Sequence, residues 1–101
     1  MAELTKVASV EQVAPGQGKI CEVGDHQVAL FNVAGKIVAC NNVCPHRGGP
    51  LGEGDLAGTI VTCPWHGWQF DVVTGVSPVN PAAKIATYPV TILGQDVLVE
   101  I

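Results

Sequence analysis

Short runs of apolar residues follow one another along the chain, and none has convincing helical periodicity. Residues 96–101 read D-V-L-V-E-I, in which apolar and polar side chains alternate as they do in a half-buried strand. Two-residue turns at 24–25, 34–35 and 94–95 each contain a glycine and separate such runs, which is typical of antiparallel hairpins. The pattern predicts strands at residues 4–10, 19–23, 26–33, 36–41, 59–62, 68–72, 86–93 and 96–101.

These elements predict an all-β fold. We expect an antiparallel base domain, a barrel or a sandwich, whose strands come from both ends of the chain. A small subdomain is inserted at about residues 41–70, where the strand pattern gives way to loops rich in glycine and proline. The length of 101 residues is near the usual size of one domain, so we expect residues 1–101 to form a single domain.

Composition and charge narrow the class of protein. Apolar residues make up 48% of the chain and charged residues 14%, as in a globular protein. The net charge is −4 and the basic residues are scattered, which argues against nucleic acid as a partner. No run approaches the ~20 apolar residues of a spanning helix, and the first residues lack a signal-peptide pattern. We therefore expect a soluble, cytoplasmic protein with no membrane partner.

Two segments inside the inserted region carry the chemistry. The first reads C-P-H-R-G-G-P-L from Cys44 and supplies His46, and the second reads C-P-W-H-G-W-Q-F from Cys63 and supplies His66. A common zinc finger takes two cysteines from one turn and two histidines from another. Here each loop offers one of each, so two loops that meet could place both sulfurs on one metal and both nitrogens on another. A [2Fe–2S] cluster with two cysteines on one iron and two histidines on the other needs that arrangement.

The neighbours of these four residues suit the same interpretation. Gly48 and Gly49 let backbone N–H groups approach a cluster closely, and Pro45 and Pro64 stiffen the loops. A single zinc ion held by the same four side chains is one alternative. Four unrelated core residues is the other, and it fits poorly because both histidines lie in loops rich in glycine and proline.

Three further residues with reactive side chains are not expected to take part in the site. Cys21 and Cys40 lie in apolar, strand-like segments and are expected to be buried free thiols. A disulfide between them is disfavoured in a reducing cytoplasm. His26 follows the turn at residues 24–25, so we expect a solvated residue at a strand end and not a metal ligand.

The two segments resemble the cluster-binding boxes of Rieske ferredoxins at every ligand position. The resemblance implies the Rieske fold and one [2Fe–2S] cluster per chain, with one iron on Cys44 and Cys63 and the other on His46 and His66. In Rieske proteins a proline-containing third loop covers the cluster, and residues 77–83 match it by position. An ordinary connection is the alternative for that loop.

The predicted function is electron transfer without catalysis. Only His26 remains once the cluster is built, so the chain cannot add a mononuclear iron site of two histidines and a carboxylate, and it has no dinucleotide fingerprint. The resemblance implies a monomeric carrier that takes electrons from an NAD(P)H-dependent flavoprotein reductase to the terminal oxygenase of an aromatic-ring-hydroxylating system. A Rieske-like small subunit of a larger enzyme, such as nitrite reductase, is the alternative.

The resemblance also implies a docking surface and a low reduction potential. We expect an apolar rim around the histidine side of the cluster, made of Gly48, Gly49, Pro50, Trp65 and Gly67. Trp65 and Trp68 are interpreted as packing residues, with an electron path or substrate platform as the alternative. High-potential Rieske proteins carry an extra disulfide and two hydroxyl donors near the cluster, and the matching positions here hold only Gly49, Trp65, Trp68 and Phe70.

Overall fold

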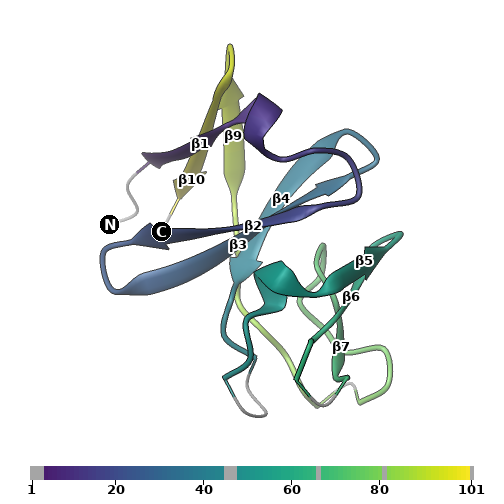
Figure 1. The fold of residues 1–101 in the computed structure, drawn as a ribbon. Helices are drawn as coiled ribbons and strands as arrows, with labels where there is room; N and C mark the ends of the chain where they lie inside the picture. Colours follow the sequence, from purple (N-terminus) through teal and green to yellow (C-terminus); the bar gives the residue numbers. More distant parts are fainter. Residues whose placement is uncertain (1–3, 45–47, 66, 81, 101) are drawn as a thin grey trace.

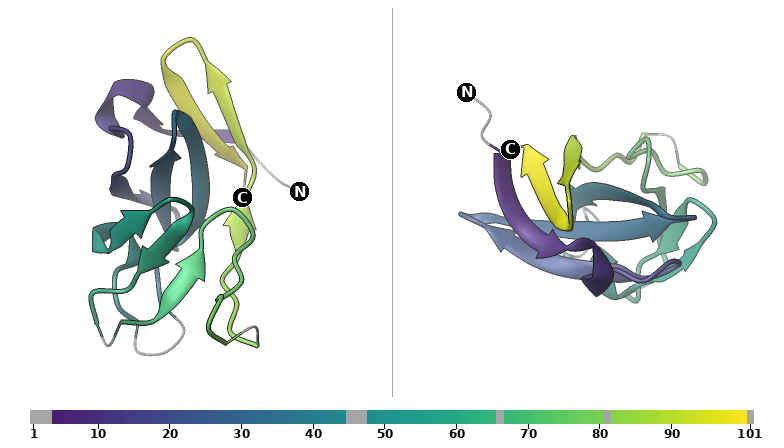
Figure 2. Two further views of the ribbon diagram at one scale, coloured as in Figure 1. Left: turned by 90° about the vertical axis from the view of Figure 1, so that its right-hand side faces the viewer. Right: turned by 90° about the horizontal axis from the view of Figure 1, so that it is seen from above.

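The computed structural model describes residues 4–44, 48–65, 67–80 and 82–100. Within these ranges the strands form three antiparallel sheets, which we call the terminal, central and small sheets (Figure 1). The terminal and small sheets lie at opposite ends of the molecule in Figure 1 and in the left view of Figure 2. The all-β prediction is confirmed.

The central sheet has the order β2-β3-β4-β8 and contains β2 (Gly18–Val23), β3 (His26–Val33), β4 (Lys36–Asn41) and β8 (Thr87–Tyr88). β3 and β4 have the predicted bounds, and their turn places Ala34 and Gly35 at φ 52° and 95°. Two positive φ values in succession match the twist of a tight hairpin. The Asn32 side chain strengthens this turn by accepting the Gly35 N–H at 2.8 Å.

The terminal sheet has the order β1-β10-β9, and joins β1 (Leu4–Ser9) to the hairpin of β9 (Val90–Leu93) and β10 (Asp96–Glu100). The predicted strand at 86–93 is divided by Pro89, because proline has no N–H to give to a sheet ladder. The chain leaves the central sheet after β8 and enters the terminal sheet at β9.

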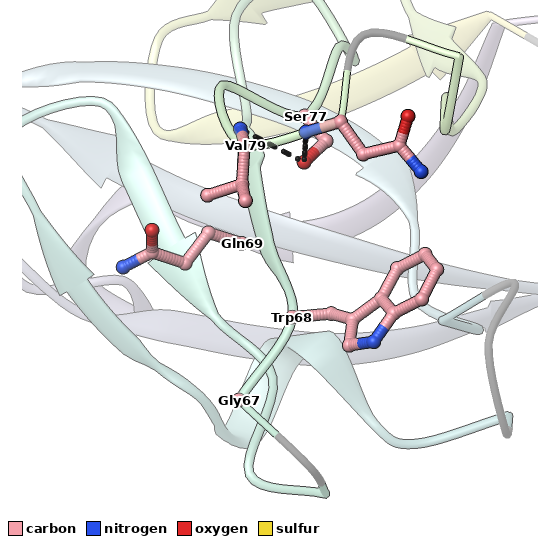
Figure 3. Close-up of a pocket in the computed structure, with 6 residues that line it drawn as sticks. Gly67, Trp68, Gln69, Ser77 and Val79 are labelled. Atoms are coloured by element: carbon pink, nitrogen blue, oxygen red, sulfur yellow. Dashed lines mark hydrogen bonds between the residues drawn. The ribbon is translucent and has the colours of Figure 1, made fainter.

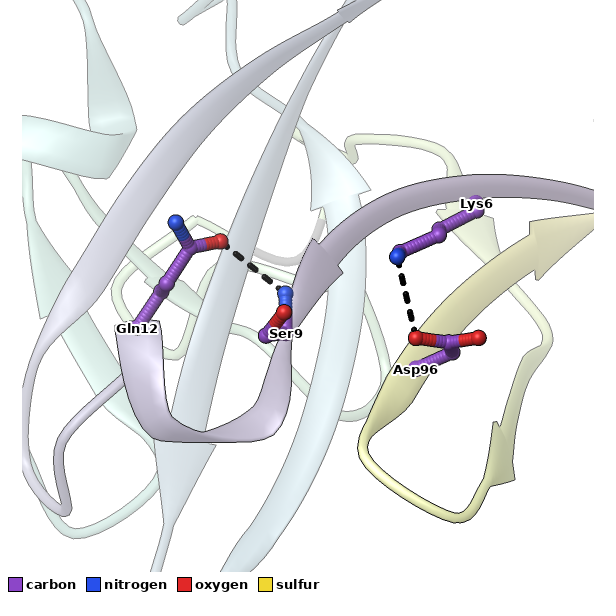
Figure 4. A network of polar contacts seen from close by, with 4 residues as sticks. All are labelled: Lys6, Ser9, Gln12 and Asp96. Carbon is purple, nitrogen blue, oxygen red and sulfur yellow. Dashed lines mark hydrogen bonds and ion pairs between the residues drawn. The ribbon is translucent and has the colours of Figure 1, made fainter.

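A short 3₁₀ turn, η1 (Val10–Gln12), follows β1 and includes Val10, which was predicted as the last residue of the strand. Gln12 accepts the Ser9 N–H at 2.9 Å and thereby caps the turn (Figure 4). Nearby, Lys6 and Asp96 form an exposed ion pair at 3.0 Å across the β1–β10 ladder. An exposed pair of this kind adds at most about 1 kcal/mol.

The small sheet contains β5 (Asp55–Ala57), β6 (Ile60–Thr62) and β7 (Gln69–Asp71), in that order. It follows the 3₁₀ turn η2 (Leu51–Glu53). The sequence predicts β6 and β7 to within a residue or two but takes residues 51–56 for a connection. β5 escapes prediction because it is only three residues long and contains a single large apolar side chain.

The core lies on both faces of the central sheet. Alternate residues of β3 point in opposite directions, so Leu30 packs in a cluster beneath the terminal sheet and Phe31 in a cluster beneath the small sheet. Cys21 belongs to the first cluster, whereas Cys40, Cys44 and Cys63 belong to the second. The ligand loops therefore rest on one half of the core.

Candidate metal centre

The first ligand loop leaves β4 and returns to the core at η2. Cys44 is buried, donates its N–H to the Gly49 carbonyl at 3.0 Å, and accepts the Gly48 N–H on its own carbonyl at 2.7 Å. Gly48 has φ of 74°, a conformation that glycine adopts without strain. One rung nearer the sheet, Val43 and Pro50 form an isolated antiparallel bridge. The loop is thus a closed hairpin with its cysteine on the inside.

The second ligand loop connects β6 to β7. Cys63 follows β6 directly, is buried, and donates its N–H to the Trp68 carbonyl at 2.7 Å. Gly67 provides the sharp return, with φ of 73°. This loop has the same construction as the first, and its cysteine also points inward.

The two loops meet at their cysteines. A Cβ added to Gly49 would lie 2.6 Å from the Cys63 sulfur and 3.1 Å from the Trp65 Cβ, so only glycine permits this approach. Gly49 is buried, and its predicted place in an exposed rim is wrong, because it lies beneath Trp65 and fills the contact between the loops.

The electrostatics of the two thiols suit a shared metal. Burial raises the pKa of Cys63, and a side-chain hydrogen bond and the charge of Cys44 raise it further, whereas a hydrogen bond with the Trp65 backbone lowers it. The Cys44 side chain therefore opposes ionisation of Cys63 unless a cation lies between them. A metal supplies that cation, since coordination deprotonates a thiol outright. The residues present fit the iron of the predicted cluster.

The predicted histidine ligands, His46 and His66, lie outside the described residues, as do Pro45 and Arg47. Their assignment stays a prediction. Of the described residues that flank these positions, Cys44 is buried, whereas Gly48, Trp65 and Gly67 are exposed.

A third loop, residues 77–80 and 82–83, lies against the second ligand loop. The buried Ser77 hydroxyl accepts the N–H groups of Val79 and Asn80 at 3.3 and 3.2 Å, and the Ser77 N–H reaches the Ala83 carbonyl at 3.0 Å (Figure 3). A cavity of about 260 Å³ separates this loop from Trp68. The loop is an organised turn beside the ligand loops, and its predicted role as a cover stays a prediction.

Exposed apolar side chains lie at the base of the first ligand loop, in the second ligand loop and in the third loop. Val43, Trp65 and Val79 are 39%, 50% and 76% exposed, and we call these three residues the apolar rim. The sequence predicts Trp65 in such a rim but not the two valines, whose only signal is their position beside the first box and within the third loop. Trp65 is half-exposed and covers Gly49, so its predicted packing around the cluster stays a prediction. Trp68 does pack against the core, with its ring centroid 6.4 Å from that of Phe70.

The other reactive residues behave as predicted. Cys21 and Cys40 are buried free thiols on opposite faces of the central sheet, so no disulfide joins them. Burial raises the pKa of Cys40 to about 12, which keeps this thiol protonated at neutral pH. His26 is exposed at the start of β3.

The matching family is the Rieske [2Fe-2S] domain, whose model covers residues 3–89. This chain belongs to the Rieske family. The family carries a Rieske-type [2Fe–2S] cluster, and the two buried thiols described above suit it. No helix in the described residues is long and apolar enough to cross a membrane.

Three similarities to known proteins are informative. The chain is 39% identical over 98 residues to the biphenyl dioxygenase ferredoxin subunit of Pseudomonas sp. strain KKS102, covering 95% of this chain and 90% of the relative. It superposes on the Sphingomonas yanoikuyae B1 ferredoxin with a TM-score of 0.88 at 31% identity, covering 98% and 99% of the two chains. It also superposes on a chain in a complex of reduced oxygenase and oxidised ferredoxin of carbazole 1,9a-dioxygenase, with a TM-score of 0.86, 28% identity and coverage of 95% and 91%.

The similarity to nitrite reductase subunits concerns the fold. A Mycobacterium tuberculosis protein described as an NADH-dependent nitrite reductase small subunit superposes with a TM-score of 0.90 at 24% identity, covering 100% of this chain and 96% of the other. At that identity the match shows a common architecture alone.

Proposed function

We propose that this Rieske protein is a one-electron carrier between a flavoprotein reductase and a terminal ring-hydroxylating oxygenase. In this proposal Cys44 and Cys63 hold one iron, and His46 and His66 hold the other. The observation that carries it is the meeting of two buried thiols from two loops of a Rieske domain. The named relatives, which are ferredoxin components of oxygenase systems, support the same direction of electron flow.

The residues around the thiols would serve such a carrier in different ways. When bound, the [2Fe–2S] cluster accepts and releases a single electron. The two hairpin loops fix the sulfur ligands, and the core that includes Phe70 and Leu51 keeps water from the cysteine side. The exposed ends of the loops leave a short path between the histidine side and a docked protein.

The apolar rim is the proposed docking surface. Val43, Trp65 and Val79 present exposed apolar area beside the ligand loops, and a carrier needs an encounter that is brief and small, below about 1,200 Å² of buried area. We propose that both partners contact this rim.

We also propose that the protein is a cytoplasmic monomer. Residues 1–101 form one domain, and its cluster-binding part lies at about residues 41–70.

Reconstitution tests the function directly. The loaded protein is mixed with a flavoprotein reductase, NAD(P)H and a terminal oxygenase of the ring-hydroxylating class, and product is measured with and without this chain. We expect product only in the complete mixture and a reduced Rieske signal when the oxygenase is omitted. Reduction by the reductase without any transfer to such oxygenases would overturn the oxygenase half of the proposal.

Two other functions give different results in simpler measurements. A fixed subunit of an enzyme such as nitrite reductase would co-purify at constant stoichiometry with a catalytic subunit, whereas a free carrier elutes alone. A structural zinc protein would be colourless, whereas the cluster absorbs visible light and contains two irons and two sulfides. The relatives are named as ferredoxins of dioxygenase systems, which favours an oxygenase partner over nitrite reductase.

A further inference from the structure

The buried side chain of Asn42 holds the base of the first ligand loop. Asn42 lies two residues before Cys44, and it is buried although its carboxamide is polar. Its Oδ1 accepts the Gly52 N–H at 2.7 Å, and its Nδ2 donates to the Gln27 Oε1 at 3.2 Å. Both functional ends of the side chain are therefore used, one toward the end of the loop and one toward β3.

The backbone of Asn42 repeats the same two connections. Its N–H donates to the Gln27 carbonyl at 2.9 Å, and its carbonyl accepts the Leu51 N–H at 2.8 Å. The residue thus joins three segments that are distant in sequence: the end of β4, the start of β3 and the first turn of η2. By contrast, the Val43–Pro50 bridge and the hydrogen bonds of Cys44 join residues of the first ligand loop to one another.

Gly52 is held from the opposite side as well. A Cβ added there would lie 2.5 Å from the Ile20 Cγ1 and 3.0 Å from the Asn42 Oδ1, so the loop base is wedged between β2 and the carboxamide. A Cβ added to Gly18 would lie 2.8 Å from the Gly52 carbonyl oxygen. Gly52 cannot slide toward β2, and Asn42 prevents its movement away.

We infer that Asn42 is a positioning residue for the sulfur ligand Cys44, which it fixes by tying the ligand loop to the central sheet. A ligand's geometry depends on the groups that hold it, and loss of such an outer group changes both metal affinity and electronic structure. The inference rests on the proposed ligation by Cys44.

Asn32 provides a matched control. It is also buried, its Oδ1 accepts the Gly35 N–H at 2.8 Å, and its Nδ2 donates to the Val13 carbonyl at 2.8 Å. It therefore makes the same two kinds of hydrogen bond, in a turn that carries no cluster ligand. Both substitutions to alanine should lower the unfolding temperature, but only one should alter the cluster.

The experiment compares Asn42→Ala with Asn32→Ala in the loaded protein. We expect Asn42→Ala to shift and broaden the electron paramagnetic resonance lines of the reduced cluster and to release iron to a chelator about fivefold faster than Asn32→Ala. Hydrogen exchange of the Gly52 amide should quicken in Asn42→Ala and not in Asn32→Ala. A parental spectrum in Asn42→Ala, with iron released at the rate of Asn32→Ala, would overturn the inference.

A second variant covers the case in which Asn42→Ala does not fold. Gln27→Met keeps the approximate shape of an exposed side chain and removes its carboxamide, which includes the acceptor for Asn42 Nδ2. We expect iron release about twofold faster than in the parent, and an unchanged rate would overturn the proposed link to β3. The iron content, sulfide content and spectrum of the unsubstituted protein test the proposed function by themselves. Failure of the proposed function is therefore distinguishable from failure of the inference about Asn42.

Discussion

The four cysteines of this chain have different roles although all four are buried. We expect Cys44→Ala and Cys63→Ala to lose the cluster, because each would remove one of the two thiolates that we propose for a single iron. Cys40→Ala should keep the cluster and cost about 1 kcal/mol of stability, as for a small truncation in the core. Iron and sulfide analysis of the purified variants decides this, and two irons retained in Cys63→Ala would contradict it.

Gly49 and Gly48 test the contact between the loops. Gly49→Ala forces a Cβ to 2.6 Å from the Cys63 sulfur, and we expect a loss of about 1–3 kcal/mol from overpacking together with reduced iron content. Gly48→Ala meets nothing nearer than the Val43 Cγ1 at 3.9 Å, but it places alanine at a φ of 74°. It should cost about 1 kcal/mol through backbone strain and leave the iron content unchanged. Equal iron content in both variants would argue against the contact.

The reduction potential depends on donors near the sulfurs. Reduction adds negative charge, so each hydrogen bond to sulfur stabilises the reduced state, and a lost bond of ~1 kcal/mol lowers the potential by roughly 40 mV. Gly49 and Trp65 cannot form a disulfide, and Trp68 and Phe70 have no hydroxyl. We expect a midpoint near the lower Rieske limit of about −150 mV. Protein-film voltammetry at pH ~7 measures it, and a value above about +100 mV would show that other donors replace them.

At the scale of elements, the third loop depends on one buried hydroxyl. Ser77→Ala removes the acceptor for the Val79 and Asn80 N–H groups, and we expect a loss of about 1–2 kcal/mol. Hydrogen exchange at both amides should accelerate. Thr74→Ala is the control, because its hydroxyl accepts only the Val76 N–H, at 3.3 Å in an exposed turn, and its loss should stay within ~0.5 kcal/mol. Unchanged protection in Ser77→Ala would mean that the loop is held by other contacts.

The elements differ in how far sequence predicts them. The bounds of the β3–β4 hairpin agree with the prediction to the residue, because long apolar runs flank a two-residue turn that contains Gly35. The sequence did not predict that Pro89 divides the strand at residues 86–93, because the apolar pattern continues on both sides of it. The division becomes visible only from the pairing, since β8 pairs with β4 and β9 pairs with β10. For the site, ligand spacing identified the cysteines. The burial of Gly49 and the exposure of Val79 depend on how the loops pack, which spacing does not determine.

Across the fold, exposed large apolar side chains lie beside the ligand loops, on the terminal sheet and, in the case of Val73, just after β7. Trp65 and Val79 belong to the rim beside the ligand loops, whereas Ile92 and Leu93 lie on β9 in the terminal sheet. We expect Trp65→Ala and Val79→Ala to slow electron transfer to the oxygenase about tenfold, with the midpoint potential unchanged. That factor corresponds to about 1.4 kcal/mol, the cost of one well-placed contact residue.

Leu93→Ala removes a comparable exposed side chain away from the loops and should leave the rate as it is. Stopped-flow transfer under pseudo-first-order conditions separates the two regions. A rate that falls equally in Leu93→Ala and Trp65→Ala would show that the rim has no special role in docking.

The meeting of Cys44 and Cys63 has a consequence for the lifetime of the protein. The two residues follow strands of different sheets and are separated in the chain by residues 45–62. If both residues hold the same metal, this length of chain is closed into a ring only while the two loops stay together. Heat that parts the loops releases the metal, so the open chain keeps none of the roughly 3 kcal/mol by which a permanent cross-link restricts a ring of about 15 residues. Resistance to heat is then a half-life governed by the rate of that first opening, and the apparent melting temperature depends on how fast the sample is warmed.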